Sequence, residues 1–107
     1  MPEGETPVLD LIGAMTAESL ARCNLAPDEL VLVRLAALAA VDARPISYLA
    51  HVGVAVESGV TLERAQDVLV AIAPIIGTAR TMSAGTNIAE ALGLVVAVAE
   101  EVLSQDD

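Results

Sequence analysis

Helix start and stop signals recur along the whole chain, and the apolar residues between them do not alternate with polar ones as they would in strands. Pro27, followed by two acids, and Thr61, followed by Glu63, are typical of helix starts, because acidic side chains favour the positive end of the helix dipole. Gly59 and Gly77 are typical of helix ends. The pattern therefore predicts an all-α fold.

These signals divide the chain into about five to six helices. The expected helices cover residues 6–23, 27–41, 45–59, 61–77, 78–92 and 94–103. Thr16 could break the first of them, Pro74 could kink the last turn of the fourth, and Gly93 separates the last two weakly. A chain of 107 residues has room for one domain, so we expect residues 1–107 to form a single compact helical bundle.

The balance of charges excludes several classes of partner. Five arginines and no lysine stand against fifteen acidic residues, which gives a net charge of −10, and such a chain repels phosphate backbones and anionic lipid surfaces. Neither nucleic acid nor a membrane is therefore an expected partner. The N-terminus is acidic, unlike a signal peptide, and the uncharged runs are shorter than the ~20 residues that span a bilayer. We expect a cytoplasmic protein.

The apolar share of the composition is unusually large for a chain of this size. It reaches 55%, which exceeds what one small monomer needs, so the excess predicts a subunit interface. Tyr48 is the only aromatic residue, and the core must therefore consist of Ala, Val, Leu and Ile side chains. We expect a homo-oligomer with a finely packed aliphatic core.

Cysteine and histidine are each present once, which limits redox and metal chemistry. Cys23 alone can form neither an internal disulfide nor a thiolate cluster, and we interpret it as a small buried apolar residue. A helical metal site would need a second ligand three or four residues after His51, where Val54 and Ala55 stand. The sequence therefore predicts no metal and no cofactor.

His51 is the candidate centre of chemistry because its expected helix is otherwise almost uncharged. Ser47, Tyr48 and Arg44 precede it by four, three and seven residues, so one continuous helix would place all four side chains on one side. This stripe is either the wall of a pocket or a hydrogen-bonded feature of the core. A Ser47 nucleophile with His51 as base and Asp42 as orienting acid is disfavoured, because no oxyanion donors can be identified.

Three segments resemble the carboxymuconolactone decarboxylase and alkylhydroperoxidase D-like family. They are LAPDELVLVRLAALAA at residues 25–40, HVGVAVESGVT at residues 51–61 and VLVAIAPIIG at residues 68–77. The firmest point is His51, ten residues before the threonine that opens the next helix. The resemblance implies an alkylhydroperoxidase D-like helical bundle whose subunits interlock into trimers or hexamers.

The chain departs from the peroxidase branch of that family, which carries Cys-x-x-Cys-x-x-x-His preceded by a glutamate. The two cysteine positions hold Arg44 and Ser47. The glutamate position falls on Leu32, and Glu29 matches it only if a three-residue insertion is allowed. Dithiol peroxide reduction needs one thiolate to attack and a second thiol to resolve the sulfenate. Alkylhydroperoxidase activity is therefore not expected.

The decarboxylase branch does not use the dithiol, and its resemblance implies lyase chemistry with His51 as general acid or base. The implied ligand is a small organic acid or lactone, bound by Arg44, Ser47, Tyr48 and Arg80, the arginines clamping an anionic group. The alternative is a non-catalytic helical module that oligomerises or binds a partner. An enzyme should place His51 and at least one arginine in an accessible cavity, whereas a module should bury His51 among packed side chains.

Overall fold

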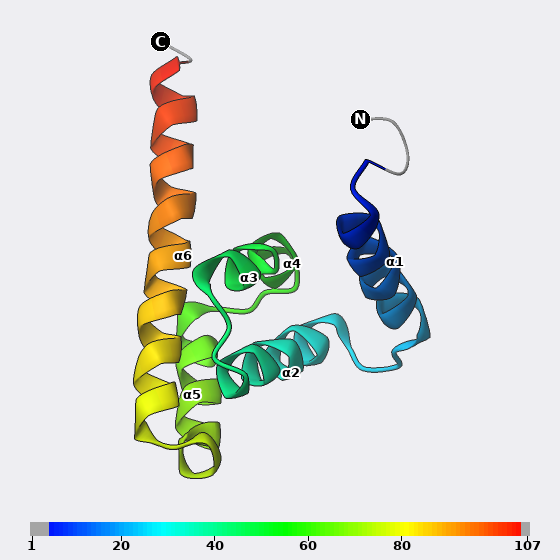
Figure 1. The fold of residues 1–107 in the computed structure, drawn as a ribbon. Coiled ribbons are helices and arrows are strands. Elements are labelled where there is room, and N and C mark those ends of the chain that lie inside the picture. The colour runs from blue at the N-terminus through cyan, green and yellow to red at the C-terminus, as the bar shows by residue number, and fades with distance from the viewer. Residues whose placement is uncertain (1–4, 106–107) are drawn as a thin grey trace.

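The computed structural model describes residues 5–105, without the side chains of residues 94–99, 102 and 105. Within that range the chain forms six helices and no strand, which confirms the all-α prediction (Figure 1). The helices are α1 (Pro7–Arg22), α2 (Pro27–Ala40), α3 (Pro45–Leu49), α4 (Val52–Glu57), α5 (Leu62–Ile76) and α6 (Thr78–Gln105).

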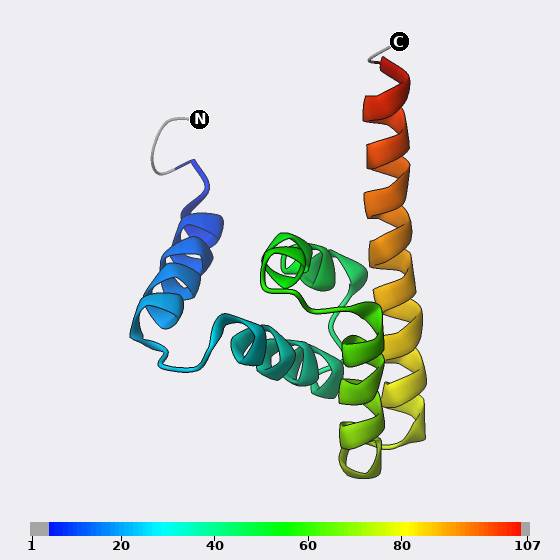
Figure 2. The ribbon, with the colours of Figure 1, turned by 180° about the vertical axis from the view of Figure 1, so that it is seen from behind.

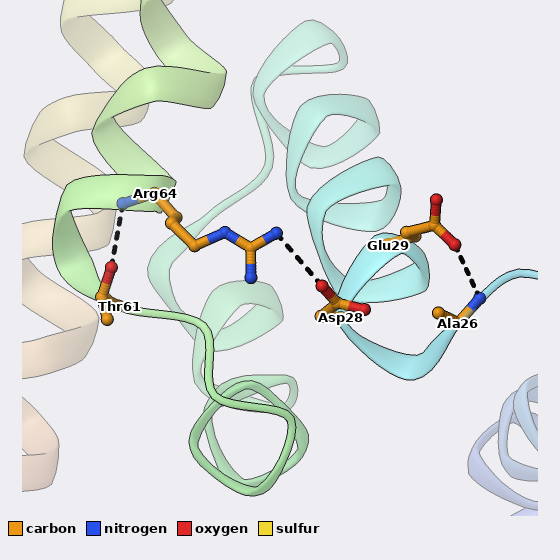
Figure 3. A network of polar contacts seen from close by, with 5 residues as sticks. All are labelled: Ala26, Asp28, Glu29, Thr61 and Arg64. Carbon is orange, nitrogen blue, oxygen red and sulfur yellow. Dashed lines mark hydrogen bonds and ion pairs between the residues drawn. The ribbon is translucent and has the colours of Figure 1, made fainter.

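The helix starts and stops follow the chemistry expected from the sequence. The Thr61 hydroxyl accepts a hydrogen bond of 3.2 Å from the backbone N–H of Arg64, which caps α5 (Figure 3). At the start of α2, the Glu29 carboxylate accepts a bond of 2.9 Å from the backbone N–H of Ala26. Gly77 ends α5 with φ of 89°, a conformation that L side chains rarely adopt.

The expected single helix over residues 45–59 is wrong, because the chain turns in its middle. α3 ends at Leu49 and α4 begins at Val52, and the backbone N–H of His51 donates to the Tyr48 carbonyl only three residues back, at 3.0 Å. The two short helices differ in their main partners, since α3 packs chiefly on α6 and also contacts α2, whereas α4 contacts α2. The turn thus allows residues 45–59 to pack on both α6 and α2.

The breaks considered at Thr16 and Gly93 are absent. α1 runs through Thr16, and α6 runs unbroken through Gly93 as one helix of 28 residues instead of the two expected. A glycine inside a helix costs only about 0.5–1 kcal/mol, which the flanking helix formers offset. Of the helices in the described range, none combines the length and apolar character needed to cross a membrane.

α2 to α5 and the first half of α6 form a compact body. α5 and α6 lie side by side as an antiparallel pair, α2 crosses them, and α3 and α4 lie above α2 (Figures 1 and 2). The core residues are Leu30, Val31, Ala39, Tyr48, Ala84 and Ala91. Ala39 and Ala84 are fully buried, so α2 and α6 bury small side chains where larger ones would hold the backbones apart.

Replacing Ala84 with leucine is expected to destabilise the fold by about 1–3 kcal/mol, because the added atoms have no free volume at a fully buried position. Urea unfolding followed by circular dichroism measures the change, and the exposed Ala71→Leu variant is the control. An Ala84→Leu protein as stable as Ala71→Leu would contradict the packing described above.

Polar side chains of α6 fix the turn that joins α2 to α3. Arg80, Ser83 and Asn87 follow one another at spacings of three and four residues, which places them on one face of the helix. Arg80 donates to the Ala40 carbonyl at 2.7 Å, Asn87 to the Ala43 carbonyl at 3.0 Å, and Ser83 to the Asp42 carboxylate. This anchoring sets where α3 begins, and hence where Tyr48 and His51 lie.

A second polar contact joins the first turns of α2 and α5. The Arg64 guanidinium donates to the Asp28 carboxylate at 3.2 Å (Figure 3). This hydrogen bond lowers the pKa of Asp28 below its usual value of 3.8. Both side chains are more than a third exposed, at 41% and 34%, so the ion pair orients the helices more than it stabilises them.

α1 stands apart from this body, joined to it through the segment before α2 (Figure 2). It has no buried residue, and its recorded side-chain contact with α2 is a 3.2 Å hydrogen bond from Arg34 to the Ser19 hydroxyl. The radius of gyration is 15.4 Å, whereas a compact domain of this length has about 13 Å. α1 and the C-terminal half of α6 account for this extended shape, because both project from the body.

Candidate functional site

A cavity of about 140 Å³ lies between α2, α4, α5 and α6. Most of its wall is aliphatic. These apolar residues are Val31, Leu35, Leu38, Val52, Ala55, Val56, Val60, Leu62, Ala65, Ile88, Ala91 and Leu92. A dry apolar cavity of about 150 Å³ is large enough to bind benzene, so this one suits a ligand with a single small ring.

Three of the described side chains of the wall carry polar atoms, and they differ in whether those atoms already have a hydrogen-bond partner. The Thr61 hydroxyl already caps α5. Tyr48 is 4% exposed, and its buried hydroxyl has no hydrogen-bond partner among the residues that the structure describes. Burial, together with the nearby Asp42 carboxylate, raises the pKa of Tyr48, so the phenol stays protonated and is a hydrogen-bond donor without an acceptor.

Among the described residues of the wall, His51 alone can change charge near neutral pH. It immediately precedes α4 and is half-buried. Burial lowers its pKa below 6.5, and the positive charge of Arg34 lowers it further. The imidazole is therefore neutral at pH 7 and has a ring nitrogen able to accept a proton.

The lowered pKa of His51 predicts how stability depends on pH. As the pH falls below 6.5, the unfolded chain binds the proton before the folded chain does, so the folded state loses stability until the folded pKa is passed. Above pH 6.5 the contribution of His51 to the stability of the folded state is constant. Urea midpoints at about pH 7.5 and about pH 5 should therefore differ more for the wild type than for His51→Gln. Equal differences would contradict a buried, neutral His51.

The structure brings together two of the five residues expected at the site. Tyr48 and His51 line the cavity, whereas the half-buried Ser47 and the exposed Arg44 and Arg80 do not. The turn between α3 and α4 explains the difference, because the side shared by Arg44, Ser47 and His51 requires one continuous helix. Arg80 holds the end of α2 instead.

The disfavoured serine arrangement finds no support in the geometry. Asp42 accepts a hydrogen bond from Ser83, and the Ser47 side chain is outside the wall that contains His51. Asp42 adopts φ of 56° in the turn after α2, so its role is to close that turn.

Sequence reasoning missed Arg34, whose charge acts on His51. On α2, Val31 precedes it by three residues and Leu38 follows it by four, and both line the cavity. This helical spacing places Arg34 near the same face, and it is the signal that could have found it. Its guanidinium donates to Ser19 of α1 and is not among the groups of the wall.

The fold and the site define a helical protein with an aliphatic cavity that carries a neutral imidazole and a buried phenol. In the part of the chain that the structure describes, no three His, Cys, Asp or Glu side chains are grouped as metal ligands would be. No family model matches the chain, and neither a curated protein nor a solved structure matches it.

Proposed function

We propose that the cavity binds a small uncharged lactone or related cyclic carbonyl compound and that His51 transfers a proton on it. The observation that carries this proposal is that His51 and Tyr48, whose hydroxyl has no partner among the described residues, both line one largely aliphatic cavity. The resemblance to carboxymuconolactone decarboxylases supports a lactone as the substrate class. Like the decarboxylase branch of that family, the proposed reaction does not use a dithiol.

The composition of the wall favours an uncharged ligand over an organic acid. No arginine is among the described residues that line the cavity, and the chain carries a net charge of −10. A carboxylate placed there would lose its hydration without gaining a cation. A lactone needs only one hydrogen-bond donor for its carbonyl oxygen, and Tyr48 has one to give.

The reaction that these two groups suit is proton transfer next to a carbonyl. The neutral His51 imidazole takes a proton from the carbon beside the carbonyl, and the electron pair moves onto the carbonyl oxygen as an enolate. The Tyr48 hydroxyl donates a hydrogen bond to that oxygen, where charge develops. The imidazolium then returns the proton to the far end of the conjugated system, which moves the double bond and needs no oxidant or reductant.

A β,γ-unsaturated lactone of this size, α-angelica lactone, is the test substrate. In D₂O, proton NMR follows both deuterium entry beside the carbonyl and formation of the conjugated isomer. We expect the protein to accelerate both above buffer, and above an equal concentration of His51→Gln. Identical rates for the two proteins would overturn the proposal.

The second candidate function is a non-catalytic helical module that assembles into a homo-oligomer, including the trimers or hexamers implied by the resemblance. The exposed apolar residues of α1 favour it. If this is the whole function, the wild type oligomerises but neither exchanges nor isomerises the lactone. The two functions are compatible, and separate measurements test them.

A further inference from the structure

α1 presents an apolar stripe that the described part of its own chain leaves exposed. Its large apolar residues are Val8, Leu9, Leu11, Ile12, Met15 and Leu20, and each is more than half exposed. At helical spacing they occupy one half of the helix circumference, opposite the charged Asp10, and share that half with Thr16, Ser19 and Arg22. Exposed apolar patches of this kind mark surfaces that associate with another protein.

The amount of exposed surface indicates a large interface. The chain exposes 7572 Å², whereas a folded monomer of 10.9 kDa exposes about 5,600 Å². The difference of roughly 2,000 Å² exceeds the ~800 Å² that each partner buries in a standard interface. One chain therefore exposes enough surface for a stable oligomer.

A groove of about 310 Å³ between α5 and α6 offers a surface of matching character. Ala65, Gly85 and Ala89 line it together with Leu62 and Leu69. Small residues let a helix approach closely, and no ionised side chain is among its described lining residues. The groove is thus suited to an apolar helix.

No α1 residue is among the described residues that line this groove in the same chain. α2 lies between α1 and the groove and separates the two in both views (Figures 1 and 2). Four residues join α1 to the start of α2, and the side-chain contact that α1 makes there is with Arg34. The stripe and the groove are thus apart within one chain of this structure.

We propose that α1 of one copy packs its apolar stripe into the α5–α6 groove of a second copy. Both surfaces belong to the same sequence, and both avoid the acidic side chains that make two copies repel each other elsewhere. A contact between two different patches of the same sequence is a heterologous interface, which joins copies head to tail. This proposal does not rest on the activity of His51.

Cysteine pairing tests where α1 docks. In a Cys23→Ser background, chains carrying Met15→Cys are mixed with chains carrying Ala89→Cys and oxidised. We expect a covalent pair of twice 10.9 kDa that contains one chain of each kind, identified by mass spectrometry. The control replaces Ala89→Cys with Ile75→Cys, which is 85% exposed and outside the groove. Equal pairing in the control would overturn the proposal.

Light scattering tests whether the contact holds the assembly together. The wild type is expected as a multiple of 10.9 kDa, and Ile12→Asp should weaken association at least about tenfold by placing a charge in the stripe. Helicity should persist, because α1 buries nothing in its own chain. The matched control, Ile75→Asp, should assemble like the wild type. A monomeric wild type, or an Ile12→Asp protein that assembles normally, would refute the proposal.

Discussion

Glutamine at position 51 is expected to lower lactone isomerisation by about 100- to 10,000-fold, the usual contribution of a positioned general acid–base group. Glutamine is polar and of comparable length, but it cannot hold the proton between its removal and its return. The deuterium exchange rate beside the carbonyl should fall by the same factor, because both processes share the first proton transfer.

The stability of the His51→Gln protein separates a chemical role from a structural one. His51 is half-buried, and its side chain makes no hydrogen bond with the residues that the structure describes, so thermal unfolding of the variant should stay close to that of the wild type. Arg44→Gln is the matched control, since Arg44 is exposed and outside the cavity wall. A large loss of melting temperature with unchanged turnover would show that His51 serves packing, contrary to the proposed function.

Phenylalanine at position 48 is expected to make the protein more stable and less active. The buried Tyr48 hydroxyl has no described partner, and removing an unsatisfied buried polar group should raise the free energy of unfolding by about 1 kcal/mol. The same substitution removes the donor to the enolate oxygen, which should lower isomerisation by about 100- to 1,000-fold.

Opposite changes in stability and activity are difficult to obtain from a merely structural tyrosine. Urea unfolding and the NMR assay measure the two effects on the same preparation. Ser47→Ala is the control on α3, because it also removes a hydroxyl but from a residue outside the cavity wall. If Tyr48→Phe instead lowers the free energy of unfolding by about 1 kcal/mol, the hydroxyl is hydrogen-bonded in the native state.

Local signals in the sequence predicted most helix boundaries, because these depend on residues within one turn. Pro27 and Thr61 begin helices by the chemistry expected of them, and Gly77 ends one. The turn at His51 was missed, since residues 45–59 contain no proline or glycine at the point where the chain bends. That turn arises from packing on α6 and α2, which no local signal records.

The candidate site was predicted in part for the same reason. Tyr48 and His51 are three residues apart, so local geometry keeps both at the cavity. The prediction that Arg44 and Ser47 belong to the site required one continuous helix. The prediction for Arg80 rested on its charge alone. Its actual partner, the Ala40 carbonyl, is 40 residues distant in sequence. Arg34 on α2 lowers the pKa of His51, which precedes α4, so only the folded chain shows this effect.

By itself, the sequence determined that the chain is helical, that its core is aliphatic with Tyr48 as its one aromatic residue, and that Cys23 has no second cysteine in the chain to pair with. These features follow from composition and short-range spacing. Only the tertiary structure decided that α3 and α4 are separate, that His51 and Tyr48 share a cavity, and that α1 leaves its apolar stripe exposed. Those features depend on which distant surfaces pack together, and the energy of that packing is distributed over residues far apart in the chain.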